Sequence, residues 1–236
     1  MKAQNPEPIP VYFMPGMAAS PEIFEHLKLP GQAFHVEYLE WFVPRPGMSL
    51  QEYAREMAAG IRHKHPVLVG VSFGGFLVQE MAAWVQARKV IIISSIKCKA
   101  EMPRRLLLAR YTKLHKLLPT SLVENVEVLA RYAFGDPVTR RLELYDRYLS
   151  MRDKTYLDWA LEQIVNWKRD SPLPGLVHIH GEQDAVFPIG HIGPCIRVPG
   201  GTHTMIIHRF RWFNQHLPAI ILEDQGSNFI PLKSNP

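Results

Sequence analysis

The sequence predicts an α/β fold, namely a three-layer α/β/α sandwich with a mostly parallel sheet of about six or seven strands and an inserted helical cap. The first observation behind this prediction is that apolar, strand-like runs alternate with helical patterns up to residue 96. Strands that are apolar throughout are buried on both faces, which is typical of parallel sheets covered by helices. The second is that residues 97–170 show helical periodicity alone. The third is that strand-like runs return after residue 171.

Four strands and three helices are expected before the cap. Strand patterns occupy residues 9–15, 34–41, 66–72 and 89–95. Helical patterns occupy residues 20–29, 49–65 and 74–88. Ser20 and Ser49 stand at the starts of two of these helices, where a serine side chain commonly accepts a hydrogen bond from the first turn. The apolar residues of 49–65 recur at a spacing of three or four, which predicts that one side of this helix packs on the sheet.

The predicted cap separates this part of the chain from the last two strands. Residues 97–170 would form about four helices. Strands are then expected at 176–181 and 195–201, and a final amphipathic helix over 204–221. We therefore expect an α/β core made of residues 1–96 and 171–225, a helical cap made of residues 97–170, and a C-terminal tail over residues 226–236.

The composition argues against several classes of protein. Residues 97–170 hold 15 Lys and Arg residues against 10 Asp and Glu residues, so the formal net charge of +5 lies wholly in the predicted cap. The charges there are mixed in sign, as on a solvated helical surface, and no nucleic-acid partner is expected. No apolar run reaches the length of a signal peptide or a membrane span. The two cysteines, Cys98 and Cys195, are far apart, which fits a reducing cytoplasm. We expect a soluble cytoplasmic protein and leave a homodimer open.

The stretch Gly70-Val71-Ser72-Phe73-Gly74 stands where the third predicted strand meets a helix. A G-x-S-x-G pattern at such a junction is typical of a nucleophile elbow, a sharp turn with no room for side chains beside the serine. The turn would hold the serine hydroxyl above the carboxyl ends of the parallel strands, where open α/β sheets bind ligands. Taken alone, Ser72 is equally compatible with a helix N-cap.

Two later residues would supply what a serine nucleophile needs. A serine hydroxyl is a weak nucleophile at neutral pH, so it requires a base within hydrogen-bond reach and a group that fixes the tautomer of that base. Asp184 follows the strand at 176–181, and His203 follows the strand at 195–201. Asp170 is a weaker candidate for the acid, because it precedes a strand. Ser72, Asp184 and His203 are therefore the predicted catalytic residues.

The order Ser72, Asp184, His203, with the contexts "HGEQD" and "GGTHTM", resembles that of the α/β-hydrolase fold family over essentially the whole chain. The resemblance implies a serine hydrolase that needs no metal and no organic cofactor. It also implies an oxyanion hole, made by the backbone N–H groups of Phe73 and of Met17 in "MPGMAAS".

The sequence departs from the pattern of this family in two places. The family often has His-Gly before the oxyanion residue, whereas this chain has Pro15-Gly16. The first two strands of the family have no counterpart, because too little chain precedes residue 10. Neither departure touches the three predicted catalytic residues.

Several aromatic and histidine residues have two readings. The candidates for a substrate pocket are four aromatic residues: Trp41, Phe42, Tyr111 and Trp159. Amphipathic cap helices also bury aromatic side chains simply as packing.

His178 and His180 share one strand face, which is the spacing of a metal pair. No cysteine or carboxylate stands at ligand spacing beside them, so we expect packing and hydrogen bonding instead, and no metal site. His63 and His65 are expected at the end of a surface helix.

The function that these features predict is hydrolysis of a small or medium acyl ester through an acyl-enzyme. The partner would be a small-molecule acyl substrate. Thioesterases, C–C bond hydrolases and lyases of the same fold are alternatives, because fold and catalytic residues do not fix the substrate. A ligand-binding module that keeps the pocket without turnover is a further alternative of a different class.

Overall fold

The computed structural model describes residues 7–106, 108 and 147–223, and its centre is a parallel β-sheet. Within these residues the sheet has six strands in the order β2-β1-β3-β4-β5-β6, and every pairing is parallel. The strands are β1 (Ile9–Met14), β2 (Phe34–Tyr38), β3 (Val67–Val71), β4 (Lys89–Ile93), β5 (Val177–Gly181) and β6 (Ile196–Val198). The parallel sheet and the number of strands are as the sequence predicts.

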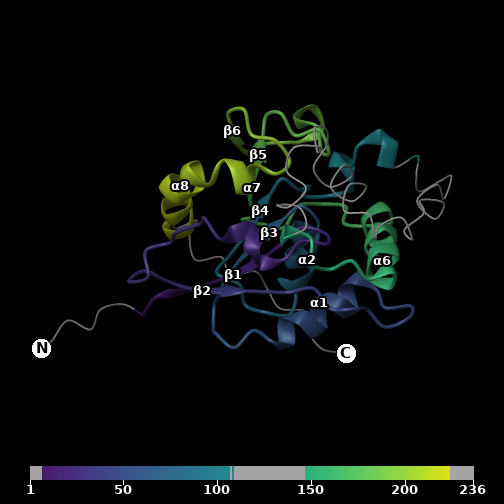
Figure 1. The fold of residues 1–236 in the computed structure, drawn as a ribbon, viewed down its shortest axis with the longest axis horizontal. Helices are drawn as coiled ribbons and strands as arrows, with labels where there is room; N and C mark the ends of the chain where they lie inside the picture. Colours follow the sequence, from purple (N-terminus) through teal and green to yellow (C-terminus); the bar gives the residue numbers. More distant parts are fainter. Residues whose placement is uncertain (1–6, 107, 109–146, 224–236) are drawn as a thin grey trace, which may run out of the picture.

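Helices cover both faces of the sheet (Figure 1). The α-helices in the described residues are α1 (Leu50–Ala59), α2 (Phe73–Met81), α6 (Lys154–Val165), α7 (Met205–His208) and α8 (Phe210–Leu222). Three short 3-10 helices are η1 (Pro21–Phe24), η2 (Lys99–Glu101) and η6 (Ile189–His191). Figure 1 shows α7 and α8 on one side of the sheet and α1, α2 and α6 on the other, so the predicted three layers are present.

The strand order has its switch point between β1 and β3. From β1 the chain passes to β2 on one side, and then returns to place β3 on the other side of β1. In an open parallel sheet the loops at the carboxyl ends of the strands diverge at such a switch point and leave room for a ligand. Residues 15–20 follow β1 and Ser72 follows β3, so two predicted parts of the site meet there.

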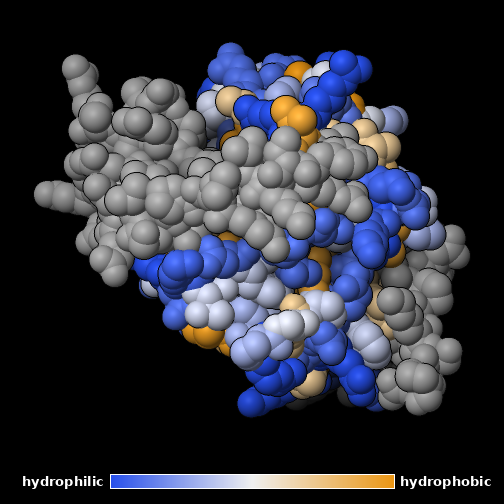
Figure 2. Space-filling view, turned by 90° about the vertical axis from the view of Figure 1, so that its right-hand side faces the viewer, coloured by the Kyte–Doolittle hydropathy of each residue, from blue (hydrophilic) through white to orange (hydrophobic). Residues whose placement is uncertain are grey.

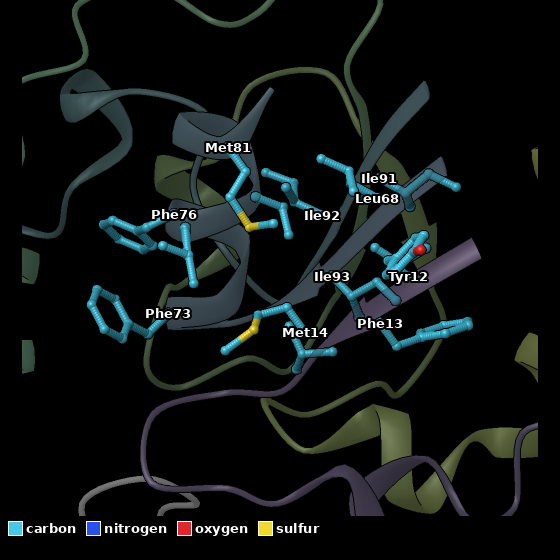
Figure 3. Packing of buried hydrophobic residues seen from close by; sticks show 14 of the residues in the cluster. Tyr12, Phe13, Met14, Leu68, Phe73, Phe76, Met81, Ile91, Ile92 and Ile93 are labelled. Carbon is cyan, nitrogen blue, oxygen red and sulfur yellow. The ribbon is translucent and has the colours of Figure 1, made fainter. Parts of the chain in front are cut away.

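The core lies between the sheet and its helices. Every residue of β3, β4 and β5 is buried, and the whole of α2 is buried as well. Figure 3 shows the Met81 side chain of α2 turned toward Ile92 of β4, whereas the rings of Phe73 and Phe76 point away from the strands, and all three are buried in the same hydrophobic cluster. Burial of α2 on all sides fixes the element that begins directly after Ser72.

The structure corrects the predicted lengths of the helices. Within residues 20–29 only Pro21–Phe24 form a 3-10 helix, and the Ser20 side chain makes no capping hydrogen bond. The helix expected over 49–65 begins with a complete capping box at Ser49 but ends at Ala59, because Gly60 is a poor helix former. The helix expected to reach residue 88 ends at Met81, since the chain must turn back to enter β4 at residue 89. The last helix is divided at Arg209 into α7 and α8.

Most of the predicted cap lies outside the described residues. Residues 107 and 109–146, which include Tyr111 and most of three of the four expected helices, are not described, and neither is the tail beyond residue 223. The fourth expected helix is α6, which contacts α2.

Two further features bear on the expectations drawn from composition. Cys98 and Cys195 are both free. Within the described residues, no helix combines the length and apolar character needed to cross a bilayer. On the face seen in Figure 2, the described surface is mostly hydrophilic.

Candidate active site

Ser72 occupies a sharp turn between β3 and α2. Its φ of 52° and ψ of −119° lie in a region that non-glycine residues rarely adopt. Hydrogen bonds to the neighbouring strand hold this backbone: the Ser72 N–H donates to the Ile93 carbonyl at 2.9 Å, and the Ser95 hydroxyl donates to the Ser72 carbonyl at 2.8 Å. The Ser72 side chain makes no N-cap hydrogen bond, so the alternative of a simple helix cap fails.

The glycines around Ser72 are explained by close backbone approaches. A Cβ on Gly70 would lie 2.3 Å from the Gly74 carbonyl oxygen, and a Cβ on Gly74 would lie 2.3 Å from the Pro15 carbonyl oxygen. Both distances are shorter than real Cβ contacts, so a side chain at either position would force the turn apart. The explanation that the sequence suggested for these two glycines is therefore confirmed.

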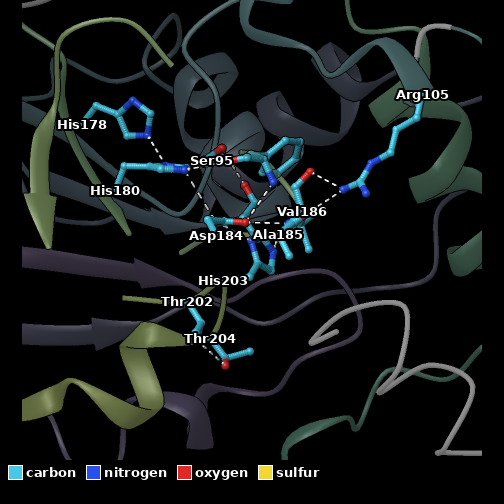
Figure 4. A network of polar contacts seen from close by, with 12 residues as sticks. Ser95, Arg105, His178, His180, Asp184, Ala185, Val186, Thr202, His203 and Thr204 are labelled. Atoms are coloured by element: carbon cyan, nitrogen blue, oxygen red, sulfur yellow. Dashed lines mark hydrogen bonds and ion pairs between the residues drawn. The ribbon is translucent and has the colours of Figure 1, made fainter. Parts of the chain in front are cut away.

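A continuous chain of hydrogen bonds links Ser72 to Asp184. His203 Nε2 lies 2.9 Å from the Ser72 hydroxyl, and His203 Nδ1 lies 2.9 Å from Asp184 Oδ2. The other carboxylate oxygen, Oδ1, accepts from the backbone N–H groups of Val186 and Phe187 at 2.8 and 2.9 Å. Figure 4 shows Asp184 between these loop residues and the His203 ring. Because the carboxylate can only accept, the His203 proton toward Asp184 sits on Nδ1, which leaves Nε2 free to act as a base toward the hydroxyl.

The surroundings of Asp184 favour its ionised form. Burial of the carboxylate raises its pKa, but the neighbouring His203 and the hydrogen bonds from His203 and Phe187 outweigh this effect. The pKa of Asp184 is therefore lower than usual. A carboxylate that stays charged beside a buried imidazole would stabilise the cation formed if His203 took a proton.

Two buried histidines, His178 and His180, lie near Asp184. The sequence predicts that they are hydrogen-bonded but not that they lie near the candidate acid. His178 Nε2 lies 3.0 Å from His180 Nδ1, and His180 Nε2 lies 2.8 Å from the Phe187 carbonyl oxygen and 3.6 Å from Asp184 Oδ2 (Figure 4). Burial lowers the pKa of His180 and, together with the neighbouring His180 and Lys97, holds the pKa of His178 well below its usual range. Both side chains are therefore neutral at neutral pH. The only sequence feature that could have indicated this position is the stretch "HIHGEQD", in which the two histidines closely precede Asp184.

The loop after β1 lies against the serine, as the prediction of an oxyanion hole requires. A Cβ on Gly16 would lie 3.4 Å from the Ser72 Cβ. Phe73 is the first residue of α2, so its N–H has no partner within the helix. Among the described residues, no backbone hydrogen bond occupies the N–H of Met17 or of Phe73. Phe73 is adjacent to Ser72 in the chain, and Met17 is adjacent to Gly16, which approaches the Ser72 side chain; the role of their N–H groups stays a prediction.

Trp41 joins the two sides of this predicted oxyanion hole. Its indole N–H donates to the Gly16 carbonyl at 2.8 Å, and its ring stacks on Phe73 with centroids 5.1 Å apart and planes 8° apart. The Tyr156 ring lies beside Trp41, with centroids 5.3 Å apart, and the Tyr156 hydroxyl lies 3.4 Å from the Ala18 nitrogen. No sequence motif marks these contacts, because they join residues far apart in the chain.

The four aromatic candidates for a pocket have different surroundings. Trp41 and Trp159 are buried, and the Trp159 indole donates to the Met48 carbonyl at 2.6 Å. Phe42 is half-buried and stacks on Tyr53 with centroids 3.9 Å apart. Tyr111 lies outside the described residues. The contacts of Trp41 and Trp159 show packing, and a role in binding substrate stays a prediction for all four.

Charged side chains from the first part of the predicted cap hold the loops beside the site. Lys97 and Glu101 form a buried ion pair at 3.0 Å, and Glu101 also accepts from the Gly193 N–H at 2.8 Å. The Arg105 side chain donates to the carbonyl of Ala185 at 2.6 Å, directly after Asp184 (Figure 4). Asp170, the rival acid, is exposed and pairs with Lys99 instead.

Solved structures that match this chain share its fold at low sequence identity. A putative lipase from Acinetobacter baumannii matches with a TM-score of 0.65 at 16% identity, over 92% of this chain and 84% of that one. A bromoperoxidase from Bacillus anthracis gives the same TM-score and identity over 92% of each chain. A structure from a study of carboxylesterases of Nitrososphaera gargenis matches with a TM-score of 0.68 at 13% identity, over 92% of this chain and 90% of that one.

The family of this chain is assigned by comparing its sequence with a family model. A search of curated proteins found no match. The model of the alpha/beta hydrolase family, in contrast, matches residues 11–216, which span the sheet, the turn at Ser72 and the loops of Asp184 and His203. The match covers well over half of the chain, and the strand order and layers agree with it. The chain therefore belongs to the alpha/beta hydrolase family and is a hydrolase of this fold.

Proposed function

We propose that this hydrolase cleaves carboxylic esters of small or medium acyl groups, with Ser72 as nucleophile, His203 as general base and Asp184 as the acid that orients it. The observation that carries the proposal is the unbroken chain of two 2.9 Å hydrogen bonds from the Ser72 hydroxyl through His203 to Asp184. These residues come from three separate loops, so their alignment at the carboxyl ends of the strands supports a shared chemical task.

The proposed reaction has two steps. His203 Nε2 takes the Ser72 proton while the hydroxyl oxygen attacks the ester carbonyl, and the oxyanion accepts hydrogen bonds from the N–H groups of Phe73 and Met17. His203 then gives its proton to the departing alkoxide, which leaves as the alcohol, and the acyl group stays on Ser72. Water adds to the acyl-enzyme by the same path, with its proton passing through His203 back to Ser72, and the carboxylic acid leaves.

We also propose that residues 97–170 form a cap over this site. Its described ends support the proposal, since they contact the loop after β1. The Ser20 N–H donates to the Tyr148 carbonyl at 2.8 Å, and the Met151 N–H donates to the Ala18 carbonyl at 3.1 Å. A cap tied to this loop would enclose the acyl group next to Ser72 and set the acyl length that fits.

A series of p-nitrophenyl esters tests the proposal. The wild-type chain should hydrolyse these esters with a burst of p-nitrophenol, and Ser72→Ala should lower kcat by about 10⁴–10⁶, the loss seen when a nucleophile of this kind is removed. Ser171→Ala is the matched control, because Ser171 is exposed and outside the site, and its kcat should equal that of the wild type. A folded Ser72→Ala variant that keeps wild-type turnover would refute the acyl-enzyme mechanism.

A further inference from the structure

A second group of chemically active side chains lies away from Ser72. His35 and Glu37 stand two apart on β2, the strand at the edge of the sheet, and His63 lies between α1 and β3. One donor atom from each of these three residues lies within 4.8 Å of the others. We propose that His35, Glu37 and His63 form a binding site for a divalent transition-metal ion of the zinc class.

The set of donor atoms favours this class of ion. Two imidazoles and one carboxylate are typical zinc ligands, whereas magnesium and calcium prefer oxygen donors alone. Residues two apart on a strand project from the same face, so His35 and Glu37 form one chelating pair. Their atoms Nε2 and Oε1 lie 2.9 Å apart, near the separation of about 3.4 Å that tetrahedral zinc with bonds of about 2.0–2.1 Å requires.

The pair is free to adjust around an ion. The side chains of His35 and Glu37 are 52% and 45% exposed, so both can rotate to complete the coordination sphere. The His63 ring already lies close, with its centroid 4.8 Å from that of His35. Solvent reaches the cluster, so water would occupy the fourth position.

Tyr12 holds the third ligand in place. Its hydroxyl oxygen lies 2.7 Å from His63 Nδ1, and its side chain is buried on β1. Tyr12 is the register partner of Glu37, so its side chain lies on the same face of the sheet as that carboxylate. Histidines that bind metals commonly engage their second nitrogen in such a hydrogen bond, which fixes the ring and its tautomer. With Nδ1 bonded to Tyr12, Nε2 of His63 is the atom left for the ion.

The site would be structural rather than part of the ester chemistry. His63 precedes β3 and Ser72 follows it, so the two sites lie toward opposite ends of that strand. A bound ion would connect β2 to the segment before β3, across β1. Because it would bind the folded chain and not the unfolded chain, it would raise the free energy of unfolding. The sequence could not show this site, because His63 was expected at the end of a helix that in fact finishes at Ala59.

Calorimetric titration of the tag-free full chain with zinc tests the proposal. The wild type should bind one Zn²⁺ per chain and should not bind Mg²⁺. His35→Ala and His63→Ala should each weaken binding by at least about tenfold, and Tyr12→Phe, which removes only the orienting hydroxyl, by about tenfold. His191→Ala is the matched control, since His191 is an exposed histidine on η6, and its affinity should be that of the wild type.

Thermal unfolding gives an independent reading that needs no enzymatic activity. Zinc should raise the Tm of the wild type and of His191→Ala, but not that of His35→Ala. The proposal is overturned if the wild type does not bind zinc, or if folded His35→Ala and His63→Ala bind it as the wild type does. It is also overturned if binding is lost instead in His203→Ala, which would place the ion at the candidate active site.

Discussion

The two halves of the candidate active site are held in different ways. Asp184 lies three residues after β5 and His203 five residues after β6, and the N–H groups two and three residues after Asp184 bind its carboxylate. The loop that carries Met17, in contrast, is held by side chains from distant parts of the chain. Trp41, which binds the loop at Gly16, is 25 residues away from it, and Tyr156 is 138 residues from its contact.

This difference indicates that the two halves should respond differently to substitution. The half that would transfer protons depends on short turns that follow β5 and β6, so changes elsewhere should leave it intact. The half that would stabilise the oxyanion depends on contacts that exist only when the sheet and the cap segment have come together. Substitutions in the first half should therefore stop proton transfer, whereas those in the second should lower the rate without altering its pH dependence.

Among the substitutions that test this comparison, the largest effect is expected for Asp184→Asn, in the proton-transfer half. The amide oxygen can still accept the loop N–H groups, so the turn should keep its shape, but an uncharged group no longer stabilises the His203 cation. We expect kcat for p-nitrophenyl acetate to fall by about 10⁴. Asp170→Asn is the control and should be unaffected, because Asp170 is an exposed partner of Lys99. Equal losses in the two variants would remove Asp184 from its proposed role.

A smaller effect is expected for Trp41→Phe, in the oxyanion half. Phenylalanine keeps an aromatic ring against Phe73 but cannot donate to the Gly16 carbonyl. We expect kcat to fall by about tenfold, less than the 10²–10³ typically lost when an oxyanion donor itself is removed. KM and the midpoints of the pH–rate profile should stay at their wild-type values.

The control for this prediction is Trp212→Phe, which changes a half-buried tryptophan of α8 and should leave kcat unchanged. Wild-type kcat in Trp41→Phe would mean that the loop holds its position without the indole. A displaced pH–rate profile would mean that the two halves are not independent.

The smallest effect is expected on the stability of the fold. It concerns His178 on β5, the strand that precedes Asp184. Burial, with the nearby His180 and Lys97, holds the pKa of His178 well below its usual range, so the folded chain keeps this side chain neutral. An unfolded histidine binds a proton near pH 6.5. The contribution of His178 to stability is thus present above about pH 6.5 and is lost as pH falls toward the folded pKa, at up to about 1.4 kcal/mol per pH unit.

Urea unfolding at pH 7, 6 and 5 measures this contribution. The free energy of unfolding of the wild type should fall as pH decreases, and the fall should be shallower in His178→Gln, which has no group to protonate. His191→Gln, which alters an exposed histidine, should follow the wild type. An equally steep fall in His178→Gln would show that other groups cause the loss.

Much of the fold and the proton-transfer half could be predicted from the sequence, because both follow from local patterns. Apolar runs mark the parallel strands, and Ser72, Asp184 and His203 each follow one of them within a short turn. Helix ends were less predictable, since periodicity continues past Gly60 although the helix does not. The hydrogen bond of Trp41 could not be predicted, because nothing in the sequence around Trp41 indicates that its indole binds the distant Gly16 carbonyl.

The most direct test of an activated Ser72 is labelling of the wild-type chain with a fluorophosphonate probe, followed by mass spectrometry of the peptides. The account predicts one adduct, on Ser72, that is absent in Ser72→Ala and in His203→Ala and present in His191→Ala. A folded wild-type chain that takes no label, or takes it on another residue, would contradict the proposed nucleophile and its base.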